Sequence, residues 1–309
     1  MKKLLVLLVL CVLPALLVAC SRHEPPAKPG RLQVVTSLFP LYDFAREVGG
    51  NKVQVSLILP PGVEPHAFEP KPDDVVRISR ADLFVYTSPY MEPWAAKLLQ
   101  GITEGKVTVV EAGKSAHYLG VAAGQNDHDH GAGKDPHIWL DLDNAALMVD
   151  AIATGLATRD PANRDYYLQN ASSYKKRLHA LDEQFRQGLA SCRTREFLSG
   201  GHNAFSYLAR RYGLTYRSAY GISAETEPTA QTLIQLVKEL RSHQLHYIFT
   251  EELLSPQVAD TIAREAGVSV LPLNGAHNLS KADMDVGVTF ISLMEQNLKN
   301  LETGLECRQ

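Results

Sequence analysis

The sequence has no excess of basic residues. Its 309 residues include 31 Lys and Arg against 34 Asp and Glu, so the formal net charge is −3. Proteins that bind nucleic acid place clustered Lys and Arg against the phosphates, and a mildly acidic chain lacks that means of binding. We therefore expect no nucleic-acid partner.

Several short motifs of enzymes are also missing. The chain contains no HExxH pair, no GxSxG nucleophile elbow and no phosphate-binding loop of the GxxxxGK[ST] type. These patterns hold a zinc ion, a nucleophile or a phosphate in the geometry that catalysis needs. We expect a binding protein and not an enzyme, and any ATP hydrolysis would need a separate subunit.

Only one long apolar run is present, and it lies at the N-terminus. Lys2 and Lys3 precede the apolar stretch 4–18, which leads through small residues to Cys20. This order is typical of a signal peptide that is cleaved before a lipidated cysteine. The run is shorter than the ~20 residues of a membrane-spanning helix. We predict a signal peptide over residues 1–19 and a lipid on Cys20.

The polar, proline-rich segment 20–30 that follows is predicted to be a tether between the lipid and the folded part. An export signal and a lipid place the protein outside the cytoplasm, in the cell envelope, either in a periplasm or on the outer face of the membrane. About 280 residues remain beyond the tether, which favours two domains over one.

Cysteine is scarce. The chain has four: Cys11 lies in the signal peptide, Cys20 is the predicted lipid site, and Cys192 and Cys307 remain. Outside the cytoplasm two otherwise unused thiols are often joined, so this pair is a candidate disulfide. Metal binding is the alternative, although neither cysteine belongs to a CxxC motif.

Short β-branched runs alternate with longer helical patterns, which is typical of parallel α/β units. The runs form two sets of four and predict an α/β fold with two lobes, each built on a mainly parallel four-stranded sheet. The predicted strands are Leu32–Ser37, Val53–Leu59, Leu83–Tyr86, Val107–Val110, Glu196–Ser199, Leu214–Ala219, Tyr247–Thr250 and Val268–Leu273.

A long helical pattern separates the two sets of strands. Asp160 and Pro161 form a helix-start signal, and apolar residues recur at helical spacing to about Leu189 with no Gly or Pro before Gly188. A helix of that length would connect the lobes stiffly. The predicted domains are an N-terminal lobe (31–159), a connecting helix (160–190) and a C-terminal lobe (191–309).

Three of the eleven histidines lie where side chains would project from strand ends or loops. They are His66 in EPHAFEP, His137 in DPHIWL and His202 in GGHNAF. Ligands of α/β sheets bind at the carboxyl ends of strands, and neutral imidazole is a common zinc ligand. A single histidine is more often structural than metal-binding. The spacing of these three therefore leaves two interpretations open, a metal site and ordinary structural histidines.

The order of these motifs resembles the solute-binding receptors of zinc and manganese ABC importers. The segments that carry the resemblance are TSLFPLYDFAREVGG, EPHAFEPKPDD, a His/Asp-rich loop, DPHIWLD and GGHNAF, and the match as a whole runs from about Arg31 to the C-terminus. The resemblance implies two α/β lobes joined by one rigid helix, with the metal between them. It also implies a permease and a separate ATPase as partners, and we expect a monomer.

The resemblance makes His66, His137 and His202 metal ligands. Manganese receptors often have glutamate at the third position, so His202 favours Zn²⁺ as the cargo over Mn²⁺. The family often has an acid soon after the last strand of the second lobe, where this sequence has the neutral Asn274. Water or His277 is the expected fourth ligand.

Three alternatives stay open. Glu251 could supply the fourth ligand. The His128–His130 loop could bind metal weakly or be an ordinary solvated loop. The same histidines could serve a zinc-dependent hydrolase with a metal-bound water, or the chain could be a surface adhesion lipoprotein.

Imidazole binds a metal only in its neutral form, which gives the first prediction. We expect the affinity for zinc to fall as the pH drops below about 6, because protons then compete for the histidines. A competition titration between about pH 7.5 and about pH 5.5 measures this. Unchanged affinity across that interval would argue against imidazole ligation.

Overall fold

The structure is a computed structural model that describes residues 30–102, 105–120, 133–223 and 227–308. The predicted signal peptide, Cys20 and the His128–His130 loop lie outside these residues. Contacts divide the chain into Met1–Arg31 and the compact unit Leu32–Gln309, and the following description concerns the second unit. Within the described part of the chain, no helix has both the length and the hydropathy of a membrane span.

The first sheet has four parallel strands in the order β2-β1-β3-β4. Side chains alternate along the strands, so Val34 and Val85 face one helical layer while Val35 and Phe84 face the other. Both faces are therefore buried, as the apolar runs predict. The elements are β1 (Leu32–Thr36), α2 (Phe39–Gly49), β2 (Val53–Leu57), α3 (Pro72–Arg80), β3 (Leu83–Tyr86), α4 (Pro93–Gln100), β4 (Thr108–Glu111) and α5 (Leu142–Arg159).

The second sheet repeats this arrangement with the order β6-β5-β7-β8, again all parallel. All eight predicted strands are present with ends within two residues of the prediction, so the two-sheet α/β fold is confirmed. The elements are β5 (Glu196–Ser199), α7 (Ser206–Arg211), β6 (Thr215–Ser218), α8 (Ala230–Ser242), β7 (Tyr247–Thr250), α9 (Gln257–Ala266), β8 (Ser269–Pro272), α10 (Lys281–Val286) and α11 (Phe290–Gly304).

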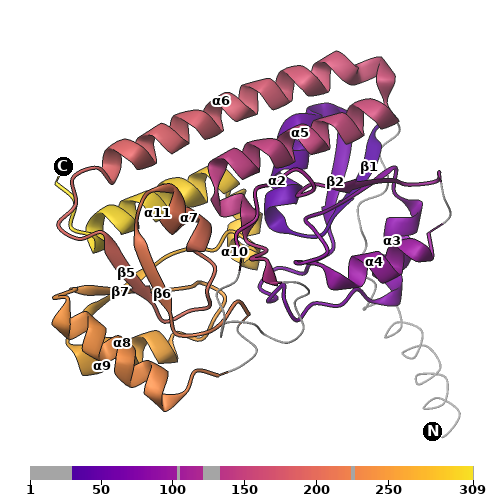
Figure 1. The fold of residues 1–309 in the computed structure, drawn as a ribbon. Coiled ribbons are helices and arrows are strands. Elements are labelled where there is room, and N and C mark those ends of the chain that lie inside the picture. Colours follow the sequence, from indigo (N-terminus) through magenta and orange to yellow (C-terminus); the bar gives the residue numbers. More distant parts are fainter. Residues whose placement is uncertain (1–29, 103–104, 121–132, 224–226, 309) are drawn as a thin grey trace, which may run out of the picture. The chain divides into compact units, whose positions relative to one another are not determined.

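One long helix, α6 (Arg164–Gly188), connects the two sheets and runs along both (Figure 1). It packs against α2 and α5 of the first lobe and against α11 of the second. Its buried side chains follow the predicted helical spacing: Tyr167, Ala171, Tyr174, Leu178, Leu181 and Phe185.

The predicted start of the connecting helix is wrong by three residues. Pro161–Asn163 form a separate 3₁₀ turn, and the α-helix begins at Arg164. The Asp160 carboxylate explains the turn, because it accepts hydrogen bonds from Asn163 Nδ2 at 2.7 Å and from the Tyr167 hydroxyl at 2.8 Å. The predicted lobe boundaries, 31–159 and 191–309, stay predictions, since contacts group Leu32–Gln309 as one unit.

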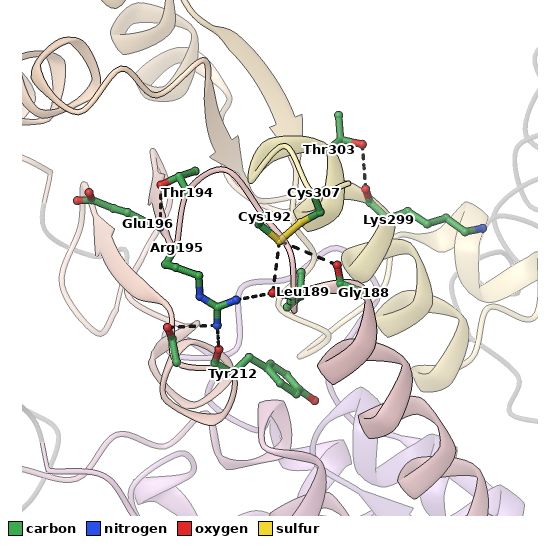
Figure 2. The surroundings of a disulfide bond; sticks show 11 residues. Gly188, Leu189, Cys192, Thr194, Arg195, Glu196, Tyr212, Lys299, Thr303 and Cys307 are labelled. Carbon is green, nitrogen blue, oxygen red and sulfur yellow. Dashed lines mark hydrogen bonds between the residues drawn. A yellow bond between two sulfur atoms is a disulfide. The ribbon is translucent and has the colours of Figure 1, made fainter. Parts of the chain in front are cut away.

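A disulfide joins Cys192, just after α6, to Cys307, just after α11 (Figure 2). Arg195 lies beside it and donates hydrogen bonds to the backbone carbonyls of Leu189 and Tyr212. The end of the connecting helix, the C-terminal helix and the first strand of the second sheet are therefore fastened together at this point.

A buried carboxylate holds the opposite end of α11. Asp43 on α2 is 1% exposed, and its Oδ2 accepts hydrogen bonds from the Phe290 backbone N–H at 2.9 Å and from the Tyr174 hydroxyl at 3.3 Å. Burial raises the pKa of Asp43 from 3.8 to about 6, against the lowering effect of the Phe290 N–H. The charges of Glu47 and Arg46 act in opposite directions on it. Three helices meet at this carboxylate.

The raised pKa of Asp43 gives a prediction for stability. The charged form is less favourable in the folded state than in the unfolded chain, so stability should fall as the pH rises from about 4 to about 6 and then level off. In Asp43→Asn this fall should be absent. The difference in unfolding free energy between variant and wild type should change by at most about 3 kcal/mol across that window, in favour of the variant at the higher pH.

Urea denaturation at a series of pH values measures the effect, with Asp285→Asn as the control because Asp285 is exposed. If the difference in unfolding free energy between wild type and Asp43→Asn is constant with pH, Asp43 has the same pKa in the folded protein and in the unfolded chain.

Candidate metal site

The three predicted histidines converge. The Nε2 atom of His137 lies 3.1 Å from the Nε2 atom of His66 and 3.1 Å from that of His202. Among the described residues, they are the group of at least three His, Cys, Asp or Glu side chains whose ligand atoms all lie within 4.8 Å of one another. Nitrogens about 2.05 Å from a tetrahedral zinc ion would be about 3.3 Å apart. The spacing therefore suits one ion bound by three imidazoles.

Each histidine comes from a loop at the carboxyl end of a sheet or from a turn beside it. His66 lies between β2 and α3, His202 lies between β5 and α7, and His137 directly precedes the 3₁₀ turn Ile138–Leu140. All three are buried, with exposed fractions of 9%, 1% and 0% respectively. Two come from the first lobe and one from the second, so both lobes form the site.

Carboxylates lie behind two of the three rings. Asp135 Oδ1 is 2.8 Å from His137 Nδ1, and Glu251 Oε2 is 2.6 Å from His202 Nδ1. Asp135 is hydrogen-bonded to His137 and so keeps the proton on Nδ1, which leaves the Nε2 lone pair for a metal, whereas Glu251 contacts His202 Nδ1 without an aligned hydrogen bond. The two rings are thus oriented with their binding nitrogens toward the centre.

The position of Glu251 depends on a glycine. A Cβ atom on Gly201 would lie 1.8 Å from Glu251 Oε1, which is closer than any real Cβ contact. Only glycine therefore lets the loop that carries His202 approach this carboxylate. Glu251, an alternative fourth ligand from the sequence, contacts the far side of the His202 ring in the structure and is not part of the three-histidine group.

The two carboxylates act on histidines whose pKa values shift in opposite directions. Burial lowers the pKa of His137, and the nearby Asp135 only partly opposes this. Burial also acts to lower the pKa of His202, but the Glu251 carboxylate together with the charges of Glu64 and Glu252 outweighs it and raises the pKa above the ordinary value. His137 is therefore the more readily available ligand as the pH falls.

His277, the predicted fourth ligand, lies beside the three-histidine group but is not a member of it. The residue is 2% exposed, and its ring centroid is 5.5 Å from that of His202. Its Nδ1 atom is buried without a hydrogen-bond partner. Burial, followed by the charges of His202 and His137, holds the pKa of His277 well below its usual range. His277 is thus a neutral imidazole next to the site.

Asn274 does not take the place of the family's acidic residue. Its Oδ1 accepts a hydrogen bond from the Ala276 backbone N–H at 2.7 Å, so the side chain is used in its own turn. The turn places Ala276 at φ 53°, in the left-handed region that non-glycine residues seldom occupy. This local strain immediately precedes His277 and sets the direction of the chain there.

The segment Gly275–Leu279 follows the last strand of the second sheet yet is bonded to the first lobe. Trp139 Nε1 donates to the Gly275 carbonyl at 2.8 Å, and Asn278 Nδ2 donates to the carbonyls of Pro60 and Val63, both at 2.8 Å. Backbone hydrogen bonds also join Phe39 to His277 and Gly62 to Leu279. The loop carrying His66 and the segment carrying His277 are therefore held side by side.

Glu64 lies on the same loop as His66. Its Oε2 accepts a hydrogen bond from the Ala67 N–H at 3.1 Å, its Oε1 is buried without a partner, and burial raises its pKa. Glu69, the acid on the other side of His66 in the sequence, is exposed. The buried unpaired oxygen adds one acceptor to the polar surroundings of the site.

A sequence model of the family described as "Zinc-uptake complex component A periplasmic" matches residues 34–304. The chain belongs to this family. The resemblance drawn from the motifs is thereby confirmed.

The curated relatives differ in length. The zinc-binding lipoprotein AdcA of Streptococcus pneumoniae is 37% identical, over 98% of this chain but only 61% of that protein. The high-affinity zinc uptake system protein ZnuA of Bacillus subtilis is 35% identical, over 92% of this chain and 91% of the relative. The chain therefore spans about three fifths of AdcA and nearly the whole of ZnuA.

Solved structures of relatives have the same fold. The Zn(II)-bound ZnuA-like domain of S. pneumoniae AdcA superposes with a TM-score of 0.77 at 34% identity, covering 90% of this chain and 100% of that one. The laminin-binding protein Lmb of Streptococcus agalactiae gives a TM-score of 0.80 at 33% identity, covering 89% and 99%. Its published description is "a bifunctional protein with adhesin and metal transporting activity".

The Glu251 contact gives a prediction for metal affinity. In Glu251→Gln the shape is kept but the charge behind His202 is lost, so affinity for zinc should fall about ten- to hundredfold. Competition with a chromophoric chelator measures the change. Glu239→Gln is the control, since Glu239 is also buried but accepts from Gln235 and Arg217 on the other side of the second lobe. Equal effects of the two substitutions would show that Glu251 has no specific effect on zinc binding.

Proposed function

We propose that the protein captures zinc outside the cytoplasm and delivers it to the permease of an ABC importer, whose ATPase is a separate subunit. The observation that carries the proposal is the spacing of the three Nε2 atoms, 3.1 Å for two of the pairs, in a buried site formed by both lobes. The names of the relatives, zinc-binding AdcA and zinc-uptake ZnuA, support the same cargo.

His66, His137 and His202 are the proposed ligands. They leave a fourth position for water or for His277, whose buried, neutral ring lies against His202. A site of imidazoles is better suited to zinc than to manganese, which prefers harder oxygen donors. An all-nitrogen site also binds Cu²⁺ and Ni²⁺ well, so the supply of metal decides the cargo along with the ligands.

Binding involves no covalent chemistry. The ion loses water as it enters, His137 and His202 present nitrogens already oriented by Asp135 and Glu251, and His66 completes the set from its own loop. Since α6 is a continuous helix and Gly275–Leu279 is bonded to the first lobe, closure should involve a small adjustment of loops rather than a large hinge motion. The permease would then recognise the loaded form.

The N-terminal segment would hold the protein at the membrane. We propose that residues 1–19 are removed as a signal peptide and that a lipid on Cys20 holds the protein at the membrane. The name "zinc-binding lipoprotein" of the pneumococcal relative supports this. The lobes, 31–159 and 191–309 with the helix between them, would then act as a monomer at the membrane surface.

The deciding experiment is a competition titration with zinc and manganese on the purified chain, comparing wild type with His202→Ala. We expect tight, zinc-selective binding that weakens by more than about a hundredfold in the variant, because removal of a ligand costs more than removal of its partner. His243→Ala is the matched control, as His243 is an exposed histidine bonded to Glu196.

Four outcomes would change the proposal. A preference for manganese would replace the cargo. Absence of tight metal binding would overturn the receptor function and leave the fold. Metal-dependent hydrolysis of esters, phosphates or amides by the loaded protein would favour the hydrolase, and loss of attachment with normal growth on scarce zinc after gene deletion would favour the adhesin.

A further inference from the structure

Helix α7 (Ser206–Arg211) begins just after His202 in the second lobe, yet its side chains bind the first lobe. The helix packs against the turn Ile138–Leu140 that follows His137. It therefore connects the loop that carries His202 to the turn that follows His137. Two of its side chains, Tyr207 and Arg211, make the connections.

The Tyr207 hydroxyl makes two hydrogen bonds across the lobes. It donates to the Asp135 carbonyl at 2.8 Å and accepts from the Leu119 N–H at 2.9 Å. The Asp135 N–H in turn donates to the Leu119 carbonyl at 3.0 Å. These three bonds form a closed ring, and Tyr207 is only 2% exposed, so its hydroxyl is shielded from competing water.

Asp135 links this ring to the metal site. Its Oδ1 accepts the backbone N–H of His137 at 3.0 Å and lies 2.8 Å from His137 Nδ1. The backbone of Asp135 is thus held by Tyr207 while its side chain holds His137. A shift of the Asp135 backbone would therefore move the imidazole.

Arg211 fastens the other end of the helix. Its guanidinium, with a side chain 7% exposed, donates to Asp141 at 2.7 Å and Asp143 at 2.8 Å at the start of α5, and to Asp182 on α6. The helix is consequently fixed at both ends to elements outside the second sheet. Tyr207 cannot follow a movement of Asp135 without disturbing these ion pairs.

We infer that Tyr207 is a positioning residue of the metal site, which sets the separation of His137 from His202 through the Asp135 carbonyl. The inference rests on the proposed zinc function. Tyr207 does not touch the metal. It makes His137 and His202 a preformed pair across the lobes, so that the ion finds these two nitrogens already in place.

The test replaces Tyr207 by Phe, which keeps the buried ring and removes the hydroxyl. The matched control is Tyr167→Phe, since Tyr167 is also buried and its hydroxyl donates to Asp160 at the far end of α6. Zinc release is followed after mixing the loaded protein with excess chelator, and the ligand geometry by the visible absorption of bound Co²⁺.

We expect zinc to leave Tyr207→Phe about fivefold faster than wild type, as loss of the buried hydrogen bond to the Asp135 carbonyl would produce, and the cobalt bands to shift. Tyr167→Phe should match wild type in both. A structural role alone would lower thermal stability and leave the cobalt spectrum unchanged. Wild-type release and spectrum in Tyr207→Phe would overturn the inference.

A second measurement needs no metal. Hydrogen exchange of the Leu119 amide in the metal-free protein should be faster in Tyr207→Phe than in either wild type or Tyr167→Phe, because the hydroxyl is the acceptor of that N–H. Unchanged exchange would also overturn the inference. If wild type itself binds neither zinc nor cobalt, the proposed function fails. If wild type binds these ions and Tyr207→Phe binds them identically, only the inference about Tyr207 fails.

Discussion

Three imidazoles must keep their Nε2 atoms pointed at one another in a buried place, and the surrounding structure serves this requirement. Neutral rings at this distance gain little from each other, so their orientation must come from groups on the far side. Asp135 and Glu251 supply it for His137 and His202 by contact with Nδ1. Gly201 then becomes essential, because a side chain there would occupy the space of the Glu251 carboxylate. The cost of burying polar groups is thus offset by pairs that fix the site before an ion arrives.

The same requirement explains how the lobes are joined. A site divided between two lobes keeps its geometry only if the lobes keep their distance, and the hydrogen bonds that do this come from short segments near the ligands. Gly275–Leu279 binds the first lobe beside His66, and α7 binds it beside His137. The long helix α6 adds stiffness along the length of both lobes (Figure 1). The lobes are therefore joined both along α6 and by short segments that lie beside the three histidines.

The sequence predicts the strands well because each is a short apolar run whose pattern is local. It also leads to His66, His137 and His202, since each lies in a motif at a strand end or turn. The acids behind the rings are harder to find. Asp135 has a weak signal in its position two residues before His137, whereas the role of Glu251 depends on how β7 lies against the loop after β5. The contact of Asp43 with Phe290 joins residues 247 apart in the chain, and no local pattern encodes it. Such contacts depend on how the lobes meet, which the spacing of residues does not describe.

The Cys192–Cys307 bond has a consequence for the fate of the chain in the cell envelope. With 115 residues between its ends, it closes a covalent ring that contains all four strands of the second sheet. A protease that cuts once inside this ring opens it but releases nothing, and the two pieces stay attached to each other and to the first lobe. A single nick in a surface loop of the second lobe would therefore leave the piece that carries His202 covalently tied to the other piece through the disulfide.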